Sequence, residues 1–332
     1  MTRAHRIYKA TLDRMKLYGL VFVAIGLMCA QLEYVQSLNK IVEMTEARTA
    51  QTNRELAEYR ASHCVGREKI QAHATAAYSV NSAGHERTYH VHVPDSYNPS
   101  NRYPVIVNYD GIDGGGLKME GYSNVDSLPV IAVYPDSLMG TSGFTAWQGA
   151  PYSLAGDYDV QFTKAMMNEV KQQYCVDDAK VFGIGMSNGG GFVVIANCQL
   201  PGMFKAIASL SGAYYTGCEG GSKPSGSLLA LHSATDPRVP FQGSETKGVP
   251  AVTEWAGLQA KARGCQKSTK TTDVYGTERY DWTGCNEGTN VRLIVLQNQP
   301  HGWLAPPYTQ ASEAPNTAGY IWSFFKESMH AK

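Results

Sequence analysis

The sequence predicts an α/β fold, in which a mostly parallel β-sheet carries helices on both of its faces. Short apolar runs, typical of buried strands, alternate with longer segments of helical periodicity along most of the chain. The 332 residues are 43% hydrophobic and 17% charged, which is an ordinary globular composition and is enough for one large domain with an appendage. The formal net charge is zero, and no basic face beyond the N-terminus indicates a nucleic-acid partner.

The N-terminal 30 residues have the pattern of a signal peptide or a signal anchor. Residues 1–16 contain five basic side chains and one acidic one, and residues 17–30 are apolar throughout. As a helix, 14 residues span about 21 Å, less than a hydrocarbon core of about 30 Å. Met28 disfavours cleavage after Ala30, so an uncleaved anchor stays open. A buried helix of a soluble protein is the third possibility. The first two predict an exported protein, either secreted or tethered to a membrane through residues 17–30.

Two further regions follow this segment. Residues 31–62 are polar and helix-prone with a thin apolar stripe, which predicts a helical stalk or linker. Residues 63–332 form the main domain. Strands are expected at 87–93, 103–109, 130–134, 181–184, 206–210, 228–232 and 291–296, and helices at 156–174, 188–198, 251–262 and 316–329. His90 and His92 fall on one face of the first strand. Without a third ligand they favour a solvated strand face over a metal site.

The most informative motif lies between an apolar strand and a helix. It reads Gly185-Met-Ser187-Asn-Gly189, the G-x-S-x-G pattern that places a nucleophilic hydroxyl on a tight turn. Two other interpretations stay open at this point. One is a dinucleotide-binding fingerprint, although Asn188 stands where the third glycine belongs. The other is a glycine-rich turn without chemistry.

Two residues downstream are candidates for the partners of Ser187. A serine hydroxyl needs a base within hydrogen-bond reach and an acid that orients the base. Asp236 and His301 each follow the end of a predicted strand, in the chain order Ser, Asp, His. His232 lies inside a strand and is expected to support this site. The backbone N–H groups of Asn188 and Ile112 are the candidates for the oxyanion hole.

A set of motifs along the main domain is similar to a known family. It comprises residues 103–107, 174–182, 185–191, 211–215, 232–240, 260–265 and 301–303. These stretches resemble feruloyl esterases of the polyhydroxybutyrate-depolymerase-like branch of the α/β hydrolases. The resemblance implies an α/β-hydrolase fold and a serine carboxylesterase that releases hydroxycinnamic acids from cell-wall polysaccharide. In it, Ser187, Asp236 and His301 match the catalytic triad, and neither a cofactor nor a metal is expected. Acetylxylan esterases and polyhydroxyalkanoate depolymerases also belong to this branch and stay open as alternatives.

The chain departs from the family pattern at two places. Asp110 replaces the usual histidine before Gly111, and a carboxylate aimed at a developing oxyanion would oppose catalysis unless it turned away. Trp303 stands in an altered segment after His301, so the acyl pocket is expected to differ. Trp147 and Trp303 are candidates for substrate binding. An inactive carbohydrate-binding module remains the non-enzyme alternative.

Six of the seven cysteines fall outside the N-terminal apolar segment, and an even set in an exported domain predicts three disulfides. The helix after Ser187 runs back along its strand, which predicts a Cys175–Cys198 pair. Cys265 and Cys285 flank a short excursion and are expected to pair, and elimination leaves Cys64–Cys218. Buried free thiols are the alternative.

Overall fold

The computed structural model describes residues 3–63, 72–216, 218, 223–305 and 316–330. The chain divides into two compact units, residues 1–63 and residues 64–332.

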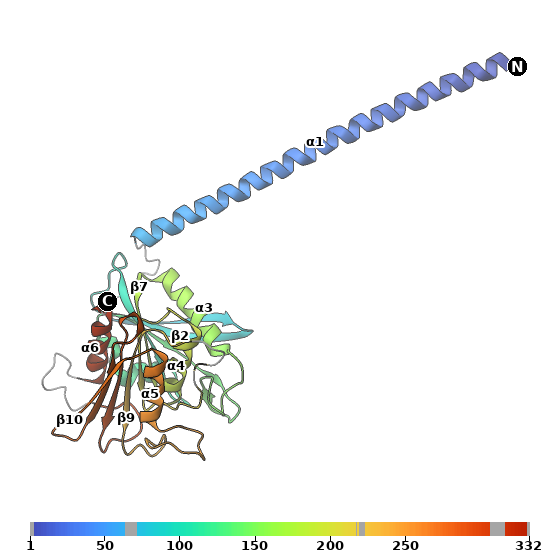
Figure 1. Cartoon of the computed structure of the whole chain (residues 1–332). Helices are drawn as coiled ribbons and strands as arrows, with labels where there is room; N and C mark the ends of the chain where they lie inside the picture. Colours follow the sequence, from blue (N-terminus) through green and yellow to red (C-terminus); the bar gives the residue numbers. More distant parts are fainter. Residues whose placement is uncertain (1–2, 64–71, 217, 219–222, 306–315, 331–332) are drawn as a thin grey trace. The chain divides into compact units, whose positions relative to one another are not determined.

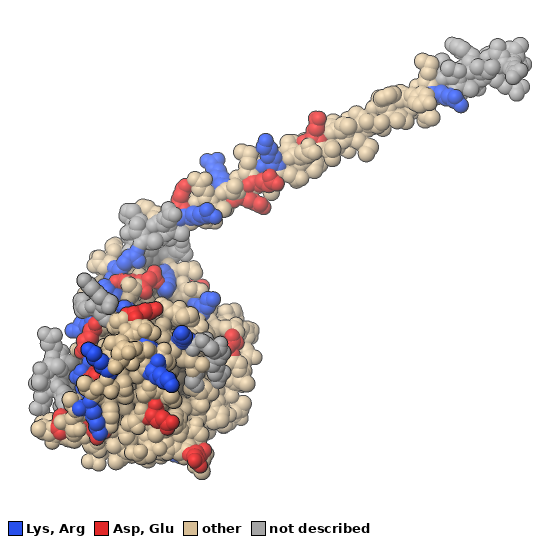
Figure 2. Space-filling view, in the orientation of Figure 1, with Lys and Arg blue, Asp and Glu red and all other residues tan. Residues whose placement is uncertain are grey.

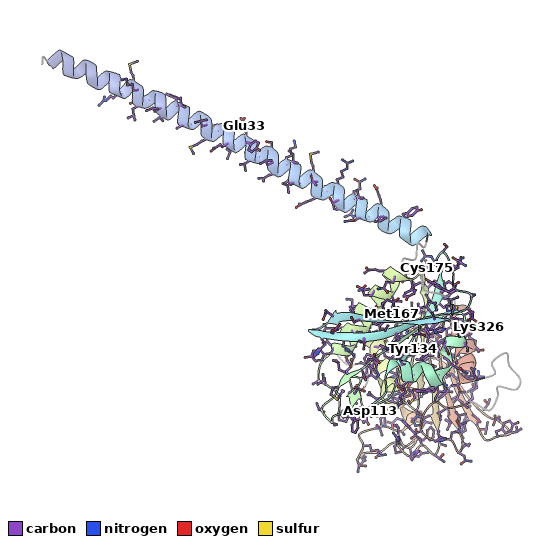
Figure 3. All side chains as sticks on the ribbon, turned by 180° about the vertical axis from the view of Figure 1, so that it is seen from behind. Glu33, Asp113, Tyr134, Met167, Cys175 and Lys326 are labelled. Atoms are coloured by element: carbon purple, nitrogen blue, oxygen red, sulfur yellow. A yellow bond between two sulfur atoms is a disulfide. The ribbon has the colours of Figure 1, made fainter. Side chains whose placement is uncertain are left out.

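The first unit is one long helix, α1 (Arg3–His63), drawn in blue in Figure 1. It runs through the position of Ala30 without a break, so the expected apolar segment and the expected stalk belong to a single helix. Between Lys16 and Glu33 the helix carries no charged residue, and Figure 2 shows this stretch free of blue and red side chains. Within Arg14–Leu56 the helix is long and apolar enough to cross a membrane, and none of its most apolar window is buried. Side chains project freely along its length, including the labelled Glu33 (Figure 3).

The second unit is built on a large mixed sheet. Among the described residues ten strands form it, in the order β1-β2-β4-β3-β7-β8-β9-β12-β11-β10. Their bounds are β1 Ala74–Ser82, β2 His85–Val93, β3 Tyr103–Tyr109, β4 Ile131–Pro135, β7 Val176–Met186, β8 Ala206–Leu210, β9 Ser227–Ser233, β10 Lys267–Thr272, β11 Glu278–Thr283 and β12 Val291–Leu296. The central strands from β4 to β12 pair in parallel. The two strands at each edge pair antiparallel. A separate small hairpin joins β5 (Leu138–Met139) to β6 (Thr145–Ala146).

Helices cover both faces of the sheet (Figure 1). Their bounds are α2 Gly116–Ser123, α3 Tyr158–Gln173, α4 Asn188–Gln199, α5 Val252–Ala262 and α6 Thr317–His330, with short 3-10 turns at Val125–Ser127 and Asn286–Gly288. Apolar side chains of α3, α4 and α5 belong to one buried cluster, and those of α2 and α6 belong to the other. The α/β-hydrolase fold expected from the sequence is therefore the fold observed.

Three strands of the large sheet were not predicted, and their composition explains the omission. β10 consists of Lys, Ser and Thr residues that are all exposed, so it lacks the apolar run that marks a buried strand. β11 is polar and only partly buried, and β1 alternates exposed with half-buried positions at the opposite edge. Edge strands face water on at least one side, so their hydrophobic signal is weak.

The disulfides correct two of the three predicted pairs. Cys265–Cys285 is present, but Cys198 bonds Cys218 and not Cys175. Cys175 is itself disulfide-bonded, and Cys64 lies outside the described residues. The predicted pair ignored the difference in rise between helix and strand. Cys198 lies 11 residues beyond Ser187, or about 16 Å along a helix. Cys175 lies 12 residues before Ser187, or about 40 Å along an extended strand. The helix therefore ends far short of Cys175.

Candidate active site

Ser187 occupies a strained turn between β7 and α4. Its backbone has φ 55° and ψ −117°, a conformation that residues with a Cβ rarely adopt. Three hydrogen bonds hold this turn. The Ser187 N–H donates to the carbonyl of Leu210 at 2.9 Å, and the Ser187 carbonyl accepts from the N–H groups of Gly191 and Ala213. The strain is thus maintained by β8 and by the loop that follows it.

The two glycines of the motif are required by close backbone contacts. A Cβ at Gly185 would lie 2.0 Å from the carbonyl oxygen of Gly189, and a Cβ at Gly189 would lie 2.3 Å from the carbonyl oxygen of Tyr109. No larger residue fits at either position without moving the backbone. At this turn the backbones of β7, the start of α4 and the end of β3 are in close contact. This packing holds Ser187 above the sheet.

The structure brings Ser187, His301 and Asp236 into one hydrogen-bonded chain. Nε2 of His301 is 2.8 Å from Oγ of Ser187, and Nδ1 of His301 is 2.7 Å from Oδ2 of Asp236. Because a carboxylate can only accept, Nδ1 carries the proton and Nε2 accepts from the serine hydroxyl. The side chain of Asp236 is fully buried and that of His301 is 8% exposed. Residues separated by 114 positions are therefore in direct contact at the carboxyl ends of β7, β9 and β12.

Asp236 is held in its ionised form. Its burial pushes the pKa of the carboxyl upward, but hydrogen bonds from His301 and from the N–H groups of Val239 and Arg238 outweigh burial, so the pKa lies below its ordinary value. The two N–H groups donate to Oδ1 at 2.9 and 2.8 Å. The opposite oxygen stays available to orient the imidazole.

His232 supports this arrangement from inside β9. It is completely buried, and its Nε2 donates to the carbonyl of Val239 at 2.9 Å. Burial lowers its pKa, which keeps the ring neutral beside Asp236. As expected from its place within a strand, His232 contacts the Asp236 loop.

Two serines at strand ends fix the His301 loop, a role that the sequence analysis did not assign. The hydroxyl of Ser211 donates to the carbonyl of Gly302 at 3.0 Å, and the hydroxyl of Ser233 donates to the carbonyl of Gln299 at 2.7 Å. The available signal was a serine directly after, or at the end of, a buried apolar strand. Such a position faces the loops that gather at that edge of the sheet.

The carboxylate of Asp110 organises the loop after β3. Its Oδ1 accepts from the N–H of Gly111 at 2.7 Å and from the hydroxyl of Tyr122, and its Oδ2 accepts from the N–H of Gly115 at 3.0 Å. Burial and the neighbouring Asp110 carboxylate raise the pKa of Tyr122, so its hydroxyl stays a donor. Both oxygens of the Asp110 carboxylate therefore accept hydrogen bonds, from two backbone N–H groups and from the hydroxyl of Tyr122.

The same loop passes directly beside the nucleophile. A Cβ at Gly111 would lie 3.3 Å from Cβ of Ser187. Ile112 is the next residue, and Asn188 begins α4, where backbone N–H groups have no partner within the helix. The assignment of these two N–H groups to an oxyanion hole stays a prediction.

Trp147 is not a substrate-binding residue, contrary to the sequence-based prediction. It is 1% exposed and stacks on Phe192 with ring centroids 5.1 Å apart. Its Nε1 donates to the carbonyl of Asp110 at 2.9 Å, and its backbone exchanges two hydrogen bonds with the side-chain amide of Asn188. Trp147 thus connects the loop after β3 to the turn of residues 185–189 around Ser187, which we call the elbow. Trp303 is half-buried against Tyr122, and its role in substrate binding remains a prediction.

His90 and His92 do not lie on a solvated face. His92 is 4% exposed and contacts Glu120 and Thr75, and Nε2 of His90 is 3.4 Å from Asp136. Helix α2 covers this side of β2, which the sequence did not reveal. Within the described part of the chain, no cluster of three metal-ligating side chains forms.

The comparisons with known proteins agree with this geometry. A family model described as a putative esterase matches residues 80–219. The chain is 30% identical over 244 residues to a probable feruloyl esterase C of Aspergillus niger, covering 72% of this chain and 83% of that protein. It is also 30% identical over 248 residues to feruloyl esterase C of Emericella nidulans, with the same coverage of both chains.

A solved structure shares the fold. The acetyl xylan esterase from Aspergillus awamori superposes with a TM-score of 0.53 at 16% identity, covering 68% of this chain and 94% of that one. At this identity the likeness concerns the fold alone. The sequence identity and coverage of the two feruloyl esterases carry the family assignment, and by that measure the chain belongs to their family of esterases.

Proposed function

We propose that this chain is a serine esterase that hydrolyses hydroxycinnamoyl esters of cell-wall polysaccharide through an acyl-enzyme on Ser187. The observation that carries the proposal is the continuous hydrogen-bonded chain from the Ser187 hydroxyl through His301 to the buried carboxylate of Asp236. The choice of ester class rests on the two feruloyl esterases to which the chain is 30% identical.

In the proposed reaction each of these residues has one step. Nε2 of His301 takes the proton of Ser187 as its Oγ attacks the ester carbonyl, and a tetrahedral oxyanion forms. The N–H groups of Asn188 and Ile112 stabilise this oxyanion. His301 then protonates the leaving alcohol, and water releases the acid by the same steps in reverse order. Asp236 holds the imidazole in the required tautomer and stabilises its protonated form.

A panel of esters tests this proposal. We expect hydrolysis of methyl ferulate to exceed that of acetylated xylan and of a polyhydroxyalkanoate film. Ser187→Ala is expected to lower kcat by about 10⁶-fold, because the reaction loses its nucleophile. Unchanged hydrolysis by the variant, with a matched circular dichroism spectrum, would reject Ser187 as the nucleophile. A preference for acetylated xylan or polyester would leave the proposed mechanism intact but would contradict the proposed substrate class.

We further propose that the enzyme works outside the cytoplasm. The Cys198–Cys218 and Cys265–Cys285 disulfides are typical of an oxidising compartment. The exposed apolar stretch of α1, residues 17–30, supports a membrane tether, because a helix that is apolar all round needs an apolar environment. Sequencing of the N-terminus of the exported protein tests this: retention of residues 17–30 supports a tether, and a start after Ala30 supports secretion.

A further inference from the structure

A buried ion pair that has no step in the proposed reaction joins β2 to the start of α3. Nη2 of Arg87 is 2.7 Å from Oδ1 of Asp159, and the two side chains are 2% and 5% exposed. The same nitrogen donates to the carbonyl of Asp136 at 3.0 Å. The guanidinium also lies over the ring of Phe162, with Cζ 4.0 Å from the ring centroid. Both charges are therefore enclosed and held in one geometry.

Stability alone is a weak explanation for this pair. Burial raises the pKa of the Asp159 carboxyl and lowers the pKa of the Arg87 guanidinium, and in each case burial outweighs the effect of the partner. Apolar residues of similar volume often replace a buried ion pair without loss of stability, whereas removal of one partner is strongly destabilising. The pair is better explained by what its hydrogen bonds hold in place.

Asp159 holds residues 145–148, which we call the bracing segment. Oδ2 of Asp159 accepts the N–H of Gln148 at 2.7 Å, while its Oδ1 accepts from Arg87. In the reverse direction, Oε1 of Gln148 accepts the N–H of Val160 at 3.1 Å. The bracing segment and the start of α3 are therefore joined from both sides.

The bracing segment is hydrogen-bonded on both sides of Ile112, whose N–H is a candidate for the oxyanion hole. The carbonyl of Thr145 accepts the N–H of Asp113 at 2.9 Å. Nε1 of Trp147 donates to the carbonyl of Asp110 at 2.9 Å. The loop that contains Ile112 is therefore fixed to the bracing segment before and after this residue.

The same segment holds Asn188, the other candidate donor. The backbone N–H of Trp147 donates to Oδ1 of Asn188 at 2.7 Å, and Nδ2 of Asn188 donates to the carbonyl of Trp147 at 3.1 Å. Asn188 is buried and directly follows Ser187. The bracing segment therefore connects both candidate donors to the ion pair.

We propose that the buried Arg87–Asp159 pair positions the oxyanion hole, by fixing the bracing segment that holds Asn188 and the loop of Ile112. Both members of the pair act through other residues and are therefore positioning residues. Their effect is expected to be large, because oxyanion donors must lie about 2.7–3.1 Å from the developing charge and a misplacement of about 1 Å is costly. The inference rests on the proposed acyl transfer at Ser187.

Two variants of the full chain test this proposal, with p-nitrophenyl acetate and methyl ferulate as substrates. In Asp159→Asn the side chain can no longer accept from both Arg87 and Gln148, so kcat should fall by about 10- to 100-fold with little change in KM. Arg87→Met/Asp159→Leu leaves no unpaired charge and should melt near the wild-type temperature. It should nevertheless keep the loss of kcat, because nothing then holds the N–H of Gln148.

Arg292→Met is the matched control. Arg292 is another buried arginine, and its carboxylate partners are Asp281 of β11 and Glu327 of α6. This variant should lower the melting temperature and leave kcat per active site unchanged. Active sites are counted in every protein by titration with a fluorophosphonate that labels the nucleophilic serine, so that a smaller folded fraction is not mistaken for slower chemistry.

A second readout separates positioning from stability. An aryl boronic acid bonds to the serine oxygen and mimics the tetrahedral intermediate, so its affinity reports on the oxyanion hole. This affinity should fall by the same factor as kcat in Asp159→Asn and in the double variant. In Arg292→Met it should stay at the wild-type value.

Lower melting temperatures with wild-type kcat per active site in both variants would overturn the proposal. Recovery of kcat in the double variant would overturn it as well, because the pair would then serve the fold alone. If Asp159→Asn yields no folded protein, the double variant decides. A wild type that hydrolyses p-nitrophenyl acetate but not methyl ferulate would contradict the proposed substrate class alone, and the test of the ion pair would still stand.

Discussion

The two units of this chain place phenylalanine side chains in opposite environments. Phe182 in β7 is completely buried, between the sheet and α6, whereas Phe22 in α1 is 74% exposed. Burial of such a side chain contributes about 1.5–3 kcal/mol, so the second unit supplies its own apolar environment and the first does not. A lone helix in water gains little stability without packing. The difference teaches that the second unit, which contains the triad, folds around its own apolar core, whereas α1 lacks one.

After Ser187→Ala, the next large loss of activity within the second unit is expected from Asp236→Asn. The variant keeps the shape of the site but favours the wrong imidazole tautomer, so kcat on an aryl ester should fall by about 10⁴-fold. The measurement is steady-state kinetics beside a thermal melt. A loss below tenfold with an intact fold would mean that another group orients His301.

The same residue gives a pH dependence. The pKa of Asp236 is lower in the folded protein than in the unfolded chain, so its stabilising contribution is fully present above the unfolded value of about 3.9. This contribution is lost as the pH falls through the folded pKa. Wild type should therefore lose more stability than Asp236→Asn below about pH 4, as followed by urea titration at several pH values.

Gly185→Ala tests how tightly the elbow is packed. The new Cβ would lie 2.0 Å from the carbonyl of Gly189, so the variant should be destabilised by about 2–5 kcal/mol and inactive. Gly257→Ala in α5 is the matched control, because a Cβ there meets nothing within 4 Å and should be neutral or slightly stabilising. Equal melting temperatures for the two variants would contradict the packing described for the elbow.

Asp110→Asn distinguishes two roles for the residue that departs from the family pattern. Its two carboxylate oxygens accept from two backbone N–H groups and one hydroxyl, and an amide turns one of these contacts into a donor–donor clash. If the carboxylate positions the loop beside Ser187, kcat should fall by about 10- to 100-fold with little change in KM. Tyr122→Phe removes only one of these donors, so kcat should fall less in this variant than in Asp110→Asn. A faster Asp110→Asn enzyme would show that the negative charge opposes the oxyanion.

The smallest effect on chemistry is expected from deletion of residues 1–63. The catalytic constants on a soluble aryl ester should stay within about twofold of the full chain, because the deleted helix is a separate unit and contributes no residue to the triad. Co-sedimentation with phospholipid vesicles should be lost. Weaker catalysis by the truncated protein would contradict the view that the second unit works independently of α1.

Part of the site could be predicted because chemistry constrains the residues themselves. A serine between two glycines, after an apolar strand and before a helix, has few other uses, and Asp236 and His301 stand at strand ends in the required order. The deep position of Trp147 could not be predicted in this way. An aromatic residue in a loop carries no sign of whether it faces substrate or packs beneath the elbow on Phe192.

The cysteine pairing shows the same limit, although both disulfides join cysteines 20 residues apart. The excursion between Cys265 and Cys285 could be recognised because no buried apolar strand interrupts it, whereas β8 lies between Cys198 and Cys218. The partner of Cys198 depended on how far α4 reaches along β7 and on the return of the loop after β8 to the end of that helix. Likewise, β10 and β11 could not be predicted as strands, because they form by pairing at the sheet edge and their sequences carry no apolar pattern.

By itself the sequence determined the alternation of strands and helices, the strained nucleophile turn and the identity of its two partners. These features depend on local hydrophobic periodicity, on glycine and on the functional groups present. Only the tertiary structure decided which donors the Asp110 carboxylate meets, which cysteine bonds Cys198, and that Trp147 is buried against Phe192. Those depend on distances between segments far apart in the chain, which are set by helix rise, strand rise and packing across the sheet.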